Sequence, residues 1–82
     1  MYKVLLVDDE YMVTEGLKRL IPFEKWDMQV VATANHADDA LDYVKENPVD
    51  VIISDVNMPD KTGLEMIKEM KEILPDTYYI LL

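Results

Sequence analysis

Hydrophobic residues along the chain form short continuous runs, and stripes at helical spacing separate these runs. Four runs read as buried strands, because they lack the in-and-out alternation of a strand with one exposed face. Parallel strands that are covered on both faces have this pattern. We expect strands at residues 2–7, 28–34, 49–54 and 77–82.

Three helices are predicted between these strands from apolar residues at i, i+3, i+4 and i+7. Pro22 ends the first helix and Pro75 follows the third, because proline cannot continue a helix. Thr62 and Glu65 match the capping box that opens a helix. We expect helices at about residues 10–21, from residue 35 or 36 to a stop at residues 47–48, and at residues 62–74.

Strands and helices thus alternate, and each connection is long enough for a right-handed crossover between parallel strands. The pattern predicts an α/β fold, a mostly parallel sheet with helices on both faces. A chain of 82 residues, half of them hydrophobic, fits one small globular domain.

The formal net charge of -9 argues against direct nucleic-acid binding by this chain, since phosphate contacts need Lys and Arg. There is no cysteine, which excludes disulfides and thiolate metal sites. No apolar run is long enough to span a membrane, and no signal peptide is evident. We therefore expect a cytoplasmic protein.

Acidic residues follow two of the predicted strands directly. Asp8 and Asp9 come after the first strand, and Asp55 comes after the third. If these strands are parallel neighbours, the three carboxylates meet at one edge and repel unless a cation lies among them. Mg²⁺ prefers such oxygen ligands, so Asp9 and Asp55 could bind it directly, Asp8 through a water, and Asn57 through its backbone carbonyl. A carboxylate beside Mg²⁺, here Asp55, can also attack phosphorus and form an aspartyl phosphate.

Simpler interpretations exist for several of these residues. Asp9 alone could favour the positive end of a helix, but Asp55 in the same pattern favours the metal interpretation. Gly63 is expected to serve turn geometry. Phe23 and Trp26 are expected to cover the end of the core, with a partner-binding role as the alternative.

Other residues with chemical potential are expected to have structural or solvated roles. His36, the only histidine, reads as a solvated residue at a helix start. Met66 and Met70 read as core residues by their helical spacing. Three aspartates on the second helix read as a solvated face: Asp38, Asp39 and Asp42.

Three stretches together resemble one known family, the receiver (CheY-like) domain of two-component response regulators. They are Leu6–Glu10 (LVDDE), Ile53–Pro59 (ISDVNMP) and Gly63–Glu65 (GLE). The acid pair alone is a weak signal, whereas the acid pair, the strand-end Asp55, and Met-Pro followed by Gly are specific in combination. The connection at residues 22–28, with its Trp, resembles receivers that are joined to AraC-type DNA-binding domains.

The resemblance implies a flavodoxin-like sheet with strands in the order 2-1-3-4-5 and the site at a topological switch point. It implies that Asp55 is the phosphoacceptor and that Asp9, Asp55 and the Asn57 carbonyl bind Mg²⁺ with help from Asp8. It also implies a sensor histidine kinase as the phosphoryl donor. Such a domain is a phosphoacceptor switch rather than a turnover enzyme, and its output is transcription through a DNA-binding domain outside this chain.

The chain also departs from the family pattern. Complete receivers carry a Ser or Thr after the fourth strand, a Lys after a fifth strand, and two more helices, whereas this sequence ends at Leu82. We expect residues 1–82 to be a partial receiver domain with strand order 2-1-3-4. Tyr79–Leu82 would then form an apolar edge that associates with a second copy or a missing half.

Two other function classes remain open from the sequence. One is a truncated or engineered half-domain that folds by association and does not signal. The other is a Mg²⁺-dependent phosphatase with an aspartyl nucleophile. Many such enzymes have a second Asp two residues after the nucleophile, where this chain has Asn57, and this counts against the phosphatase.

Overall fold

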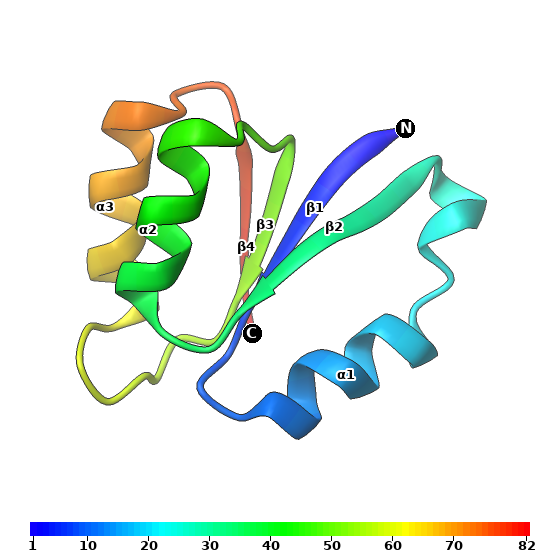
Figure 1. Ribbon diagram of the computed structural model, residues 1–82, viewed down its shortest axis with the longest axis horizontal. Coiled ribbons are helices and arrows are strands. Elements are labelled where there is room, and N and C mark those ends of the chain that lie inside the picture. The colour runs from blue at the N-terminus through cyan, green and yellow to red at the C-terminus, as the bar shows by residue number, and fades with distance from the viewer.

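The computed structural model of the protein describes residues 1–82, and its four strands form one parallel sheet in the order β2-β1-β3-β4 (Figure 1). The predicted strands, helices and strand order are confirmed. The elements are β1 (Tyr2–Val7), α1 (Tyr11–Leu20), the 3-10 helix η1 (Phe23–Trp26), β2 (Met28–Ala34), α2 (Ala37–Glu46), β3 (Val51–Ser54), α3 (Gly63–Ile73) and β4 (Tyr78–Leu81).

Helices cover both faces of the sheet, but unequally. Helices α2 and α3 lie together on one face, and α1 lies on the other (Figure 1). The core under α2 and α3 contains thirteen buried residues, including Met66 and Met70, which confirms their core assignment. The core on the α1 side contains four: Val4, Leu6, Phe23 and Ile53. Both faces of the central strands are therefore buried, which explains why β1 reads as a continuous apolar run.

A register shift interrupts the pairing of β1 with β2. Val4 pairs with Val30, but Leu5 pairs with Ala32, so Val31 is an extra residue on β2. Side chains normally alternate between the faces of a strand, and a bulge reverses this alternation beyond the extra residue. Accordingly, Val30 packs against the α1-side core, whereas Val31 and Ala32 both pack against the core under α2 and α3.

The connection between α1 and β2 corrects one expectation. Phe23 is buried, as predicted, but Trp26 is 66% exposed and does not cover the core. The short helix η1 contains only four residues, and it ends at Asp27 in the left-handed region with φ 56°. Phe23 at the start of this turn is therefore part of the core, whereas Trp26 at its end faces solvent.

The element boundaries differ from the predictions by one or two residues. The capping box that opens α3 is present, with the Thr62 hydroxyl accepting from the Glu65 amide and the Glu65 carboxylate accepting from the Thr62 amide. Strand β4 pairs with β3 alone, so it is an edge strand as expected. None of the helices has the length and apolar character needed to cross a membrane.

Candidate functional site

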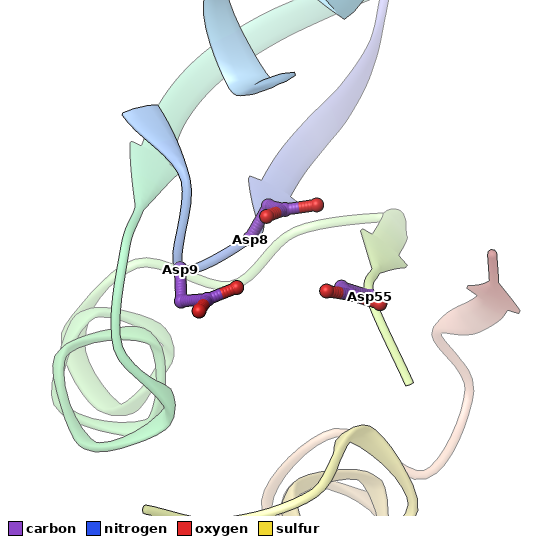
Figure 2. A group of neighbouring side chains, drawn as sticks. All are labelled: Asp8, Asp9 and Asp55. Carbon is purple, nitrogen blue, oxygen red and sulfur yellow. The ribbon is translucent and has the colours of Figure 1, made fainter. Parts of the chain in front are cut away.

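Strands β1 and β3 bring the predicted acidic residues together. The two strands are parallel neighbours, and Val7 pairs with Ser54, so the next residues, Asp8 and Asp55, emerge side by side. The Asp55 amide donates to the Val7 carbonyl at 2.9 Å and extends this pairing past the strand ends. Carboxylate oxygens of Asp8, Asp9 and Asp55 lie within 4.8 Å of one another (Figure 2). We call this group of three carboxylates the acidic corner.

Asp8 is the buried member of the acidic corner, with 8% of its surface exposed. Burial is the main cause that raises the pKa of its carboxyl group, and the nearby carboxylates of Asp55 and Asp9 raise it further. The Glu10 amide, which donates to the Asp8 carboxylate at 2.9 Å, opposes this rise in the pKa. The negative charge at Asp8 is thus poorly compensated by the protein itself.

Asp55 lies at the start of a tight turn. Its carboxylate accepts a hydrogen bond from the Asn57 amide at 3.1 Å, an Asx turn that folds the chain back towards the strand end. The backbone carbonyl of Asn57 accepts no hydrogen bond from within the chain. This carbonyl therefore has no competing partner within the chain, and its role as a metal ligand stays a prediction.

Gly63 is needed for a close approach rather than for an unusual backbone angle, which corrects the expectation of turn geometry. Its φ is not positive. A Cβ atom at this position would overlap the backbone carbonyl oxygen of Asp55 and would lie 3.2 Å from the Cα of Val56. The Gly63 amide also donates to the Val56 carbonyl at 2.9 Å. The start of α3 is thus pressed against the residues that carry the acidic corner.

The acidic corner has the properties of a site for a hard cation. None of its three carboxylates forms an ion pair with a positively charged side chain. Carboxylates without a cationic partner are the oxygen ligands that Mg²⁺ selects in proteins. The residues present therefore fit the ion that the sequence predicted.

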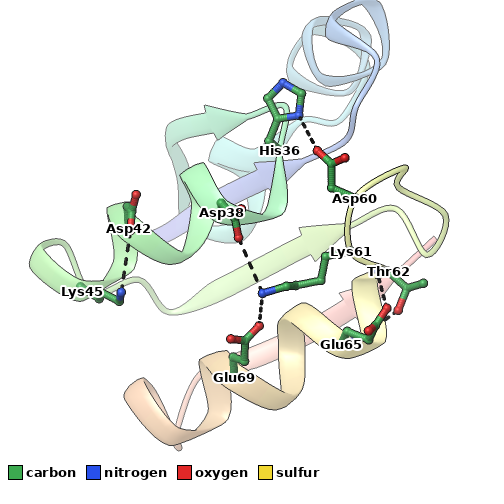
Figure 3. Close-up of polar contacts among 9 residues, drawn as sticks. All are labelled: His36, Asp38, Asp42, Lys45, Asp60, Lys61, Thr62, Glu65 and Glu69. Carbon is green, nitrogen blue, oxygen red and sulfur yellow. Dashed lines mark hydrogen bonds and ion pairs between the residues drawn. The ribbon is translucent and has the colours of Figure 1, made fainter.

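The side chains of Met58 and Lys61 help to hold the loop between β3 and α3, residues 55–62. Met58 is buried in the core under α2 and α3, with 7% of its surface exposed. The ammonium group of Lys61 lies between two carboxylates, 3.6 Å from that of Asp38 on α2 and hydrogen bonded to that of Glu69 on α3 (Figure 3). The loop is thus attached to both helices on this face of the sheet.

Sequence reasoning missed two polar contacts near the site. The Asn35 side chain donates from Nδ2 to the Asp8 carbonyl at 2.9 Å, across a separation of 27 residues. Asp38 pairs with Lys61, although its helix face remains exposed as predicted. No local pattern marks either contact, because each depends on the packing of segments that are distant in sequence. His36 is an exposed residue at the start of α2, as expected, and its Nδ1 lies 4.0 Å from a carboxylate oxygen of Asp60.

Comparisons with known proteins point to one family. The sequence model described as the response regulator receiver domain matches residues 4–82. The response regulatory protein SERP2406 of Staphylococcus epidermidis is 33% identical over 73 residues, which cover 89% of this chain and 29% of that protein. The transcriptional regulatory protein YesN of Bacillus subtilis is 32% identical over 82 residues, which cover all of this chain and 22% of that protein.

Solved structures agree with this assignment. The receiver domain of AraT, a response regulator from Geobacillus stearothermophilus, superposes with a TM-score of 0.90 at 36% identity, covering 98% of this chain and 62% of that chain. A two-component transcriptional regulator AraC from Clostridium phytofermentans gives 0.92 at 26% identity, covering 99% and 65%. This chain therefore spans less than a third of the curated relatives and less than two thirds of these solved chains. With its flavodoxin-like sheet, its acidic corner and these matches, the chain belongs to the receiver domain family of two-component response regulators.

Proposed function

We propose that this chain is a receiver module that accepts a phosphoryl group on Asp55 from a sensor histidine kinase, with Mg²⁺ bound at the acidic corner. The observation that carries the proposal is the meeting of Asp55 with Asp8 and Asp9 at the ends of neighbouring parallel strands, without any cationic side chain to pair them. Receiver domains act as phosphoacceptor switches and are not classed as turnover enzymes, which agrees with the predicted absence of turnover.

Each residue has a definite part in this proposal. Asp9, Asp55 and the Asn57 carbonyl would hold Mg²⁺, and Asp8 would hold one of its waters. When bound, the ion neutralises charge on the phosphoryl oxygens. A carboxylate oxygen of Asp55 attacks phosphorus, and the bond from phosphorus to the donor breaks, with its electron pair leaving on the donor imidazole. The Asn57 amide keeps the Asp55 carboxylate oriented through its hydrogen bond of 3.1 Å.

The wider role follows from the relatives and is part of the same proposal. The transcriptional regulatory proteins YesN and HptR are both similar to this chain over most of its length. These likenesses support the proposal that the chain is part of a cytoplasmic regulator that controls transcription through a separate output domain. The formal net charge of -9 argues against direct nucleic-acid binding by this segment.

Intact mass spectrometry after incubation with acetyl phosphate, with and without Mg²⁺, tests the proposal. We expect a gain of one phosphoryl group that needs Mg²⁺ and is absent in Asp55→Asn. Asp76→Asn is the matched control, because Asp76 is an exposed carboxylate in the connection between α3 and β4. No gain in a sample that circular dichroism shows to be folded would refute Asp55 phosphorylation by this chain.

Association through β4 is a second candidate property. This strand pairs on one side only, and Tyr78 and Ile80 on it are exposed. We propose that the free edge of β4 pairs with another strand, from a second copy or from a further segment. Sedimentation velocity across a range of concentrations tests self-association, which a concentration-independent monomer would exclude.

The phosphatase alternative is less well supported, because the position two residues after Asp55 is Asn57, which cannot act as a general acid or base. Its test is a turnover assay on phosphate monoesters in the presence of Mg²⁺. Rates equal to those of the buffer blank would exclude it.

A further inference from the structure

The backbone of Asp8 is fixed from outside its own loop. The Asp8 amide donates to the Ala34 carbonyl at 3.1 Å, and the Asp8 carbonyl accepts from Nδ2 of Asn35 at 2.9 Å. Both partners belong to the junction between β2 and α2. Two consecutive residues of this junction therefore hold the backbone of Asp8 on both of its hydrogen-bonding groups.

This arrangement matters most for Asp9. Asp9 is exposed and belongs to the same planar peptide group as the Asp8 carbonyl. The orientation of that plane sets the direction in which the chain leaves Asp8, and with it the starting point of the Asp9 side chain. A hydrogen bond to the Asp8 carbonyl thus acts on Asp9 without touching its carboxylate.

The chemistry of the donor suits this position. Asn35 is partly buried and its amide is neutral. A Lys or Arg at this point could also donate to the carbonyl, but its charge would compensate the carboxylates nearby and reduce their attraction for a cation. A neutral amide fixes the geometry and leaves the charge of the acidic corner unchanged.

We infer that Asn35 is a positioning residue for the acidic corner: its side-chain amide fixes the Asp8–Asp9 peptide plane and so aims Asp9 at the cation. The aiming of Asp9 rests on the function proposed above, whereas the fixing of the peptide plane does not. Side chains that orient metal ligands in this indirect way commonly affect metal affinity by tenfold or more.

Three variants isolate the contact. Asn35→Ala removes the side-chain donor, and Asn35→Ser replaces the amide with a hydroxyl donor on a shorter side chain. Asn47→Ala is the matched control, since Nδ2 of Asn47 donates to the Tyr43 carbonyl at 3.1 Å at the opposite end of α2. All three are compared with the unchanged chain by circular dichroism to establish that they fold.

The first measurement needs no metal. Hydrogen exchange by NMR reports on the Glu10 amide, which donates to the Asp8 carboxylate at 2.9 Å. In metal-free protein, Asn35→Ala is expected to exchange this proton about fivefold faster, the effect of losing one neutral hydrogen bond. Asn47→Ala is expected to leave the exchange rate of this proton unchanged. Equal exchange in Asn35→Ala and the unchanged chain would overturn the inference, whether or not Mg²⁺ binds.

The second measurement is Mg²⁺ affinity by isothermal titration calorimetry. Asn35→Ala is expected to raise the Mg²⁺ dissociation constant about tenfold, Asn35→Ser to recover part of the affinity, and Asn47→Ala to have no effect. With acetyl phosphate, saturating Mg²⁺ should restore the phosphorylation rate of Asn35→Ala. If the unchanged chain binds Mg²⁺ and Asn35→Ala binds it with the same dissociation constant, the role of Asn35 in orienting Asp9 is overturned, but the fixing of the peptide plane is not. Absence of Mg²⁺ binding by the unchanged chain would overturn both that role and the proposed function.

Discussion

The β1–α1 loop, residues 8–10, and the β3–α3 loop, residues 55–62, both supply carboxylates to the acidic corner, but different contacts hold them. The short loop is held by hydrogen bonds at Asp8: its amide donates to the Ala34 carbonyl, its carbonyl accepts from the Asn35 side chain, and its carboxylate accepts from the Glu10 amide. The long loop is held by one apolar side chain, Met58, by close packing at Gly63, and by ion pairs of Lys61.

The difference shows that two loops of unequal length can be held by different kinds of contact. A loop of three residues has few backbone groups to fix, and the neighbouring strand end supplies the partners. A loop of eight residues loses more conformational entropy on ordering, so it needs contacts with helices that lie farther away. The stability of the short loop should therefore depend on the charge of its own residues. The stability of the long loop should depend on side-chain packing and on salt concentration.

Removing the apolar contact of the long loop is expected to have the largest effect. Met58→Ala deletes a buried side chain and should lower the free energy of unfolding by about 3 kcal/mol. Met70→Ala, a change to a fully buried residue within α3, should lower it by a similar amount. Chemical denaturation monitored by circular dichroism measures both changes.

Hydrogen exchange then separates the two methionine variants. Met58→Ala should increase exchange at amides of residues 55–62 more than at residues 8–10, whereas Met70→Ala should not favour this loop. Equal loosening of both loops in Met58→Ala would mean that the long loop has no anchor of its own.

Adding one carbon atom at Gly63 is expected to have the next largest effect. In Gly63→Ala the new methyl group meets the Asp55 carbonyl, which belongs to the backbone and cannot rotate away. We expect a loss of about 2 kcal/mol in the free energy of unfolding, together with weaker Mg²⁺ binding, because Asp55 must shift. Gly16→Ala on α1 is the control, since a Cβ there has no neighbour within 4 Å. A stable Gly63→Ala with unchanged Mg²⁺ affinity would show that the contact relaxes without moving the site.

Removing the buried charge of the short loop is expected to stabilise the metal-free chain. The pKa of Asp8 is raised in the folded state above its ordinary value of 3.8, chiefly by burial. The folded state then binds a proton more tightly, so this contribution to stability is present below the unfolded-state pKa and is lost as the pH rises through the folded-state pKa. Asp8→Asn removes the charge and retains an oxygen that can accept from the Glu10 amide.

Thermal unfolding by circular dichroism tests this sign. At pH 7 without metal, Asp8→Asn should melt at a higher temperature than the unchanged chain, and the difference should shrink as the pH approaches 4. Asp76→Asn controls for the change in net charge. Mg²⁺ should raise the melting temperature of the unchanged chain more than that of Asp8→Asn. A lower melting temperature for Asp8→Asn at pH 7 would contradict the prediction.

The ion pairs of Lys61 are expected to give the smallest effect, one that depends on salt. Lys61→Met keeps most of the apolar length of the side chain but loses the contacts with Asp38 and Glu69. We expect a small decrease in melting temperature at low ionic strength that fades at about 1 M salt, where screening acts over about 3 Å. Lys45→Met, which removes only the pair with Asp42 on the same helix, is the control. A loss that persists at high salt would mean that packing, rather than charge, holds Lys61.

The sheet and the acidic corner could be predicted from the sequence because both depend on local signals. Apolar runs mark the strands, and the carboxyl ends of parallel strands meet at one edge, so Asp8 and Asp55 had to be neighbours once their strands were. The contacts of Asn35 and Lys61 could not be predicted, because they join segments whose distance is set by packing. The extra residue Val31 was also hidden, since an apolar run carries no alternation in which a reversal could be seen.

The exposure of Trp26 could not be predicted from the sequence either, and this exposure has a practical consequence. It is the only tryptophan of the chain, and it stands on η1, at the end of β2 opposite the acidic corner. Since Trp26 is already 66% exposed in the folded chain, its emission should shift little on denaturation. Intrinsic fluorescence is therefore a poor gauge of unfolding for this molecule, but a well-placed optical probe for whatever approaches that end of the sheet.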